Sequence, residues 1–353
     1  MPIINYKLNR LTKSIEVSRE KLKEFLTSQG IEAEEHYTLR KLIRLIPTKI
    51  VRPYNLDNNL YGHSMINLGC NNVLITGGAI NSDTVIADNY MLNVANNTKI
   101  VKLQLDVPRQ KHSVVMCYGT NILFSGGLNG GLTGDRLNQN QVYNLETNTF
   151  TTKLNLPSSR ERFTSNYNTN VVYMLGGITG TGWGSIDNFH YAYNVSTNSY
   201  TSKTTVGNYA GQATINYNGY YYFGGQENQH SKVRNWVKYY NRDNDTFTSK
   251  QGLFESRSTL TAIDLKNNNI LLSGGYKMNN AKSCKNEIYN ISSNTYTNKS
   301  DLNPPRSDHG CVYLGDGGIL VGGKTTSENE VQGTPINTVE FYNYKRDEFY
   351  KRE

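Results

Sequence analysis

Val73-Leu-Ile-Thr-Gly-Gly78 is one of six short apolar runs that end in a glycine doublet. The doublets are Gly77–Gly78, Gly126–Gly127, Gly176–Gly177, Gly224–Gly225, Gly274–Gly275 and Gly322–Gly323. Their spacings are 49, 50, 48, 50 and 48 residues. A nearly fixed period of this length indicates stacked supersecondary units, none of which can bury its apolar face alone.

Each unit contains four short runs rich in β-branched and aromatic residues. In the second unit these runs are 112–117, 121–127, 141–145 and 149–153, with turn residues between them. The pattern predicts a four-stranded antiparallel meander. In every unit but the first, a Tyr is followed seven residues later by an aromatic residue, and we expect the two on adjacent strands of a hairpin. These pairs are Tyr143/Phe150, Tyr193/Tyr200, Tyr240/Phe247, Tyr289/Tyr296 and Tyr342/Phe349.

The glycine doublet followed by a Tyr and a spaced aromatic residue resembles the kelch repeat, with Phe or Tyr where that family usually has Trp. The resemblance covers residues 57–353 and implies an all-β, six-bladed β-propeller of four-stranded antiparallel blades. We therefore expect an N-terminal helical attachment segment at 1–47 and a propeller at 48–353. How the ring closes, and whether residues 48–52 reinforce the last blade, stays open. A fold of this kind does not by itself imply an activity.

Residues 1–47 lie outside the repeat. Ser18 is a candidate N-cap for a helix that stops at Gly30, and a second amphipathic run spans 38–46. The segment resembles short helical modules in tail-fibre and baseplate proteins of phages of Gram-positive bacteria, which implies attachment to a tail. Packing on the propeller or on copies of itself is the alternative. A trimer would suit a fibre, but the segment has too few heptads to require one.

The charge distribution argues against a nucleic-acid partner. Residues 1–50 contain ten Lys or Arg and six Glu, so they carry +4 of the total net charge of +8, and the other 303 residues carry the remaining +4. A nucleic-acid-binding propeller would need a denser basic stripe.

The lengths and positions of the apolar runs indicate where the protein is located. No run approaches the 18 apolar residues that a membrane-spanning helix needs, so we expect no membrane insertion. The N-terminus lacks the apolar region and cleavage site of a secretory signal, so we expect synthesis in the cytoplasm. The expected final location is the virion tail, with the cytoplasm as the alternative.

Candidate binding residues come from the face that carries the long connections. Two ladders precede the innermost strands there: Leu60, Arg109, Arg160, Asn208, Arg257 and Arg306, and three residues further on His63, His112, Phe163, Gly211, Leu260 and His309. The arginines, together with Arg162, could grip carboxylates, sulfates or phosphates, or could brace loops. The three histidines could hold a transition metal or could fix loops to neighbouring blades. We predict no metal and no cofactor.

Trp183, in Gly-Thr-Gly-Trp-Gly on a long connection, is a further recognition candidate. An exposed indole stacks on sugar faces or anchors a protein interface, whereas a buried one would pack over a neighbouring blade. Both alternatives are open at this point.

The run Gly318-Ile-Leu-Val-Gly-Gly-Lys-Thr325 has the spacing of a phosphate-binding P-loop. A P-loop needs a strand before the glycine-rich loop and a helix after Lys-Thr. Here the apolar letters are the strand itself and the glycines are the sixth doublet, so we interpret the match as coincidence.

These patterns favour a non-catalytic binding module. We expect a phage tail-fibre or receptor-binding protein whose propeller contacts a host surface glycan or protein and whose residues 1–47 contact tail or baseplate proteins. An intracellular kelch adaptor with a protein partner is one alternative. A second is an enzyme similar to the kelch sialic-acid epimerases, with Glu161 or Glu255 as acid or base.

Overall fold

The computed structural model describes residues 19–20, 23–24, 56, 58–95, 98–131, 134–181, 184–227, 232–278, 281–315, 317–325 and 333–350. The chain divides into two compact units, Met1–Arg52 with Glu353, and Pro53–Arg352. In the first unit the four described residues are helical. The rest of the predicted helical segment, and residues 48–52, lie outside the described residues. In the described part, no helix has the length and apolarity to cross a membrane.

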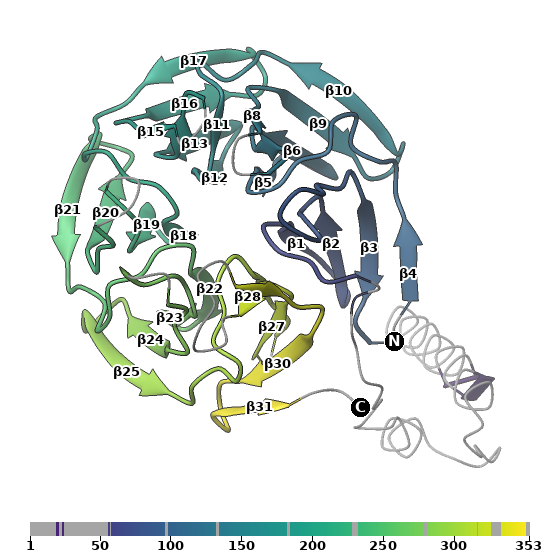
Figure 1. Cartoon of the computed structure of the whole chain (residues 1–353), viewed down its shortest axis with the longest axis vertical. Coiled ribbons are helices and arrows are strands. Elements are labelled where there is room, and N and C mark those ends of the chain that lie inside the picture. Colours follow the sequence, from purple (N-terminus) through teal and green to yellow (C-terminus); the bar gives the residue numbers. More distant parts are fainter. Residues whose placement is uncertain are drawn as a thin grey trace, which may run out of the picture. The chain divides into compact units, whose positions relative to one another are not determined.

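The second unit is a ring of six four-stranded antiparallel sheets, as the repeat predicts. Figure 1 shows the sheets as blades around a centre, with β1, β5, β12, β18 and β22 innermost. The strands of blades one to three are β1 (Ser64–Gly69), β2 (Asn72–Thr76), β3 (Asn89–Asn93), β4 (Thr98–Val101); β5 (Ser113–Met116), β6 (Asn121–Ser125), β9 (Asn140–Asn144), β10 (Thr149–Lys153); β12 (Thr164–Asn168), β13 (Val171–Leu175), β16 (His190–Asn194) and β17 (Ser199–Ser202).

Blades four to six repeat the pattern. Their strands are β18 (Ala213–Asn216), β19 (Tyr220–Phe223), β20 (Val237–Asn241), β21 (Thr246–Lys250); β22 (Thr261–Lys266), β23 (Asn269–Ser273), β24 (Asn286–Asn290), β25 (Thr295–Lys299); β26 (Gly310–Tyr313), β27 (Gly317–Val321), β30 (Val339–Asn343) and β31 (Glu348–Tyr350). Each blade takes its four strands in sequence order. The P-loop-like run is therefore strand β27 followed by a doublet, as interpreted from the sequence.

Seven two-residue strands stiffen the long connections on one side of the ring. They are β7 (Leu128–Asn129), β8 (Asp135–Arg136), β11 (Arg160–Glu161), β14 (Ile178–Thr179), β15 (Ser185–Ile186), β28 (Lys324–Thr325) and β29 (Thr334–Pro335). The pairing of β11 with β14, together with isolated bridges in the other five blades, brings the residues that follow each doublet next to the residues that precede each innermost strand. In their described parts, the long connections are thus held by paired backbone.

The core lies between the blades. Its clusters join residues of neighbouring sheets, for example Ile66 and Leu74 of blade one with Ile122 and Phe124 of blade two. This arrangement follows from the alternation of the strands, because each sheet presents apolar side chains to both neighbours. One such cluster joins blade six, through Val321 and Phe341, to blade one.

The glycine doublets allow the blades to approach one another closely. The amide of the second glycine donates to a carbonyl of the next blade, as in Gly127 N to Arg160 O at 2.8 Å. A Cβ on the first glycine, Gly126, would lie 2.6 Å from that same oxygen. Gly126 also has φ of +58°, a conformation that favours glycine. The periodic doublets are therefore an inter-blade contact repeated around the ring.

The ring closes with this same contact. Gly323 N of blade six donates to Leu60 O of blade one at 2.7 Å. Two further bonds, Leu60 N to Ile336 O at 3.1 Å and Leu56 N to Asn337 O at 2.8 Å, repeat those made inside the ring by Arg306 and Leu302. Among the described residues, closure involves no strand exchange between the ends of the propeller.

The five aromatic pairs occupy the outer hairpins and lie directly opposite each other, as predicted. Their ring centroids are 4.8–4.9 Å apart. Each first tyrosine donates its hydroxyl to an Asn or Asp five residues on, as in Tyr193 to Asn198 at 2.6 Å. Asn198 also accepts the backbone amide of Leu154, which arrives from the previous blade. The outer edges of the blades are thereby tied together.

Candidate functional site

Six residues immediately before the innermost strands form a closed hydrogen-bonded circle, which we call the collar. They are Gly62, Lys111, Arg162, Gly211, Thr259 and Asp308. The backbone amide of each donates to the carbonyl of the collar residue in the preceding blade, at 2.6–3.3 Å, and Gly62 closes the circle by donating to Asp308. The collar therefore defines the mouth of the central channel on the long-connection face.

All six collar residues adopt the left-handed conformation, with φ from +49° to +67°. Gly62 and Gly211 do so without strain, whereas a residue with a Cβ loses about 1–2 kcal/mol there. Thr259 is the most unusual case, since β-branched residues rarely have positive φ. Four positions thus carry side chains at a conformational cost that glycine would avoid.

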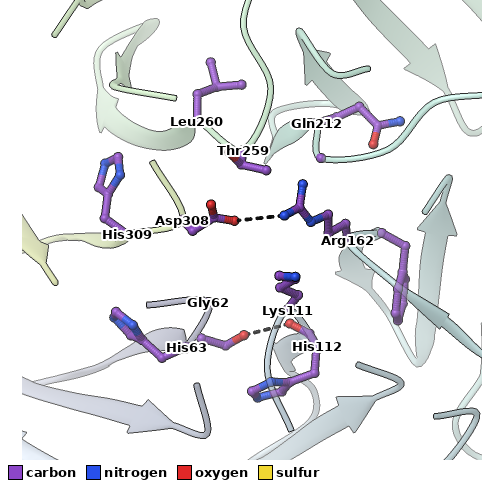
Figure 2. A pocket seen from close by; sticks show the side chains of 13 residues that line it. Gly62, His63, Lys111, His112, Arg162, Gln212, Thr259, Leu260, Asp308 and His309 are labelled. Atoms are coloured by element: carbon purple, nitrogen blue, oxygen red, sulfur yellow. Dashed lines mark hydrogen bonds and ion pairs between the residues drawn. The ribbon is translucent and has the colours of Figure 1, made fainter. Parts of the chain in front are cut away.

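A pocket of about 150 Å³ occupies the channel mouth. It is lined by the whole collar and by His63, Ser64, His112, Phe163, Gln212, Leu260 and His309. Figure 2 shows Arg162 and Asp308 reaching toward each other across the mouth. Their closest N–O distance is 3.7 Å, which is an ion pair but too long for a hydrogen bond.

Charged side chains gather behind the collar. Glu161 is buried and pairs with Lys111 at 3.3 Å and with Arg136 at 3.0 Å. Although burial alone would raise it, the cations Lys111, Arg162 and Arg136 hold the pKa of Glu161 below its ordinary value. Glu161 is therefore an ionised structural carboxylate rather than a protonated acid.

Lys324 approaches the mouth from β28, where Ser307 of the neighbouring segment pairs with it through the backbone. Its ammonium group lies 3.8 Å from the centre of the Tyr61 ring. Burial lowers the pKa of Lys324 to about 8, although Asp308 opposes that shift. Burial would raise the pKa of Asp308, but Arg162 and Lys111 hold it below its ordinary value.

The four first-ladder arginines Arg109, Arg160, Arg257 and Arg306 are fully buried. Each donates to the carbonyl of the first doublet glycine in its own blade: Gly126, Gly176, Gly274 and Gly322, at 2.8–3.4 Å. Each also bonds to an acidic or amide side chain of the third strand or of the connection before it: Gln139, Asp187, Glu287 and Glu340. The structure places them as braces of the long connections, and only Arg162 of the five candidate arginines reaches the pocket.

The histidines His63, His112 and His309 are buried and lie apart around the mouth (Figure 2). Each ring packs on a doublet of the neighbouring blade; a Cβ on Gly77, for example, would lie 2.8 Å from His112 Cε1. Among the described residues, no three His, Cys, Asp or Glu side chains are placed to hold a metal. Burial lowers the pKa of His63 to about 4 and of His309 to about 3, so both are neutral near pH 7.

Two sequence assignments change in blade four. Gly177 N donates to the carbonyl oxygen of Tyr209, just as Gly127 N donates to that of Arg160 one blade earlier. Tyr209, and not Asn208, therefore belongs to the first ladder. Gln212 then replaces Gly211 in the second ladder, and Gly211 belongs to the collar. The constant offset of three residues hid this shift. Trp183 lies outside the described residues.

The sequence analysis missed Lys111, Lys324 and Asp308 as site residues. Lys111 and Asp308 each directly precede a histidine of the second ladder, and Lys324 directly follows the sixth doublet. A comparison across the six repeats could have found Lys324, because the other five doublets are followed by uncharged residues. It could also have shown that Lys111, Arg162 and Asp308 occupy one equivalent position.

No known protein family and no curated protein sequence matches the chain. Among solved structures, the one described as "Structure of YjhT" superimposes with a TM-score of 0.71, over 84% of this chain and 98% of that chain, at 13% sequence identity. The fold is a six-bladed kelch-like β-propeller. At this identity the likeness concerns the fold alone. Any function depends on the residues at the channel mouth of this kelch-like propeller.

Proposed function

We propose that this protein is a non-catalytic binding module whose kelch-like propeller recognises a host surface glycan at the channel mouth. The observation that carries the proposal is the collar, which holds four side chains at a pocket in a strained backbone conformation. Strain of this kind is retained where the side chains serve recognition. The closed circle of backbone hydrogen bonds around the pocket also favours binding without reorganisation.

The polar lining supports a ligand with many hydroxyl groups. Buried atoms without a hydrogen-bond partner collect around this pocket, among them Thr259 Oγ1, Arg162 Nε and both amide atoms of Gln212. Buried polar groups normally have partners, and a hydroxyl-rich ligand or its water could supply them to the atoms nearest the mouth. A flat apolar protein surface would leave them unsatisfied.

The proposed setting is a phage tail or tail-like particle, with residues 1–47 as the attachment segment. Its support is the resemblance of that segment to tail-fibre and baseplate modules. Mass spectrometry of purified particles tests this part separately. Absence of the protein from the particles would refute the tail assignment and leave the binding proposal standing.

A second candidate function is sugar epimerisation, and Lys324 favours it. A lysine with a pKa of about 8 can exchange a proton near neutral pH. Of the two glutamates considered from the sequence, Glu161 is committed to Lys111 and Arg136, and Glu255 pairs with Lys277 at 3.1 Å. Proton NMR of sugar solutions containing the protein would reveal epimerisation directly.

A glycan array probed with the full chain tests the binding proposal. The matched variants are Arg162→Asn at the mouth and Arg346→Asn in the exposed turn of the last hairpin, since Asn tolerates the left-handed backbone at 162. We expect loss of array signal only for Arg162→Asn. Equal signal for both variants would refute the mouth as the binding site, and a protein ligand captured there instead would favour the adaptor alternative.

A further inference from the structure

Positive charge gathers at the mouth. Among the described residues, Lys111, Arg162 and Lys324 all act on one collar carboxylate, Asp308. A second carboxylate, Glu161, lies behind the collar. A partly buried site of this kind carries excess positive charge in a region of low dielectric, where an added anion interacts strongly.

Asp308 alone faces several of these cations from the collar. Arg162, Lys111, Lys324 and Lys282 all act on its carboxylate, yet the ion pair with Arg162 spans 3.7 Å. The side-chain pairs of Glu161 are with Lys111 and Arg136 behind the collar, so the ion pair of Arg162 at the mouth is with Asp308. Arg162 therefore retains donor capacity at the mouth, and its buried Nε atom has no hydrogen-bond partner.

Lys324 shows the same imbalance from the other side. Burial lowers the pKa of Lys324 more than Asp308 raises it, and repulsion from Lys111, Arg162 and Lys282 lowers this pKa further. An anion in the mouth would relieve this repulsion and replace part of the lost hydration. The planar guanidinium of Arg162 suits a carboxylate in particular, because both partners are flat and can form two parallel hydrogen bonds.

We infer that the mouth is an anion site that takes the carboxylate of an acidic sugar, held by Arg162, Lys324 and Lys111, with Asp308 as a competing internal carboxylate. This inference rests on the proposed function and names its ligand class. It implies opposite effects for two kinds of substitution. Loss of a cation weakens binding, and loss of the Asp308 charge strengthens it.

The test uses the full chain on an array of glycans that carry uronic or sialic acids, printed beside the same glycans with methyl-esterified carboxyl groups. Sulfated and phosphorylated glycans form a third set. We expect esterification, Arg162→Asn and Lys324→Gln each to reduce apparent affinity by about tenfold or more, which corresponds to the loss of one hydrogen bond to a charged group. Lys345→Gln, in the exposed last hairpin turn, is the matched control and should change nothing.

Asp308→Asn is the decisive variant. Asn keeps the shape and tolerates the left-handed conformation of this position, so the variant should fold. We expect it to bind acidic glycans several-fold more tightly than the natural protein. Unchanged or weaker binding would overturn the inference, as would a preference for sulfated or phosphorylated glycans over carboxylated ones.

A second measurement separates the inference from the proposed function. The thermal unfolding midpoint is recorded in sodium glucuronate and in sodium chloride of equal ionic strength, for the natural chain and for Asp308→Asn. A glucuronate-specific increase, larger in Asp308→Asn, supports the anion site whatever the array shows. Binding of neutral glycans that Arg162→Asn abolishes, together with no glucuronate effect, would keep the glycan-binding function and refute the anion site.

Discussion

Replacement of Gly322 by Ala tests how the propeller closes. Gly322 has φ of +58°, and a Cβ on it would lie 2.2 Å from Leu60 O, an atom of blade one. That oxygen accepts the closing bond from Gly323 N at 2.7 Å. The methyl group must therefore push blade one away by about 1 Å and lengthen this bond, since carbon and oxygen atoms normally remain more than 3 Å apart.

The expected free-energy change has separable parts. The left-handed backbone alone should cost about 1–2 kcal/mol. Overpacking typically adds about 1–3 kcal/mol, and a weakened buried backbone bond adds about 1–3 kcal/mol. We therefore expect Gly322→Ala to lower the free energy of unfolding by about 3–8 kcal/mol.

Gly119→Ala is the matched control, because Gly119 has the same φ of +58° and a Cβ on it would meet nothing within 4 Å. It should cost only the backbone part, about 1–2 kcal/mol. Gly126→Ala, at an interface inside the ring, should resemble Gly322→Ala. Urea unfolding followed by circular dichroism measures all three variants. Equal midpoints for Gly322→Ala and Gly119→Ala would refute the closure described above.

Three further predictions concern the braces, the collar and pH. Glu287→Gln leaves the fully buried Arg257 without its ion-pair carboxylate and should destabilise the protein by about 3–5 kcal/mol in urea unfolding, while the exposed Glu146→Gln should have little effect. Thr259→Asn should raise the unfolding free energy by about 1 kcal/mol, because Asn tolerates a φ of +49°; a lower unfolding midpoint would contradict the strain argument. Binding of acidic glycans should weaken as pH rises through about 8, because Lys324 then loses its proton among Asp308, Lys111, Arg162 and Lys282, and Lys324→Gln should abolish this pH step.

The blades could be predicted from the sequence because their contacts repeat. The doublets and the Tyr–aromatic pairs each recur at nearly constant intervals, and each corresponds to one contact between or within blades. The order of strands in every blade follows from the same repeat. Closure stayed open although Leu60 was placed in the first ladder, because the sequence left undecided whether residues 48–52 reinforce the last blade.

The candidate site was harder to predict because it does not repeat. Lys111, Arg162, Lys324 and Asp308 come from three different repeats, and only the ring brings them to one mouth. The first-ladder arginines do repeat, and this repetition made them candidate binding residues. In the structure each makes the same contact in its own blade, because each donates to the carbonyl of a doublet glycine. Arg162 is the informative exception, since it lies outside that ladder and reaches the pocket.

The backbone of the collar sets the diameter of the mouth, and the side chains of the collar set its chemistry. Its backbone bonds fix the positions of six residues, four of which carry side chains, and these bonds involve no side-chain atom, so the aperture follows from the number of blades alone. Gly, Asn, Asp, Lys or Arg could be exchanged at each position while the circle stays closed. A propeller of this kind can diverge toward new ligands one collar residue at a time, and a designed library confined to these six positions would sample many specificities on one rigid frame.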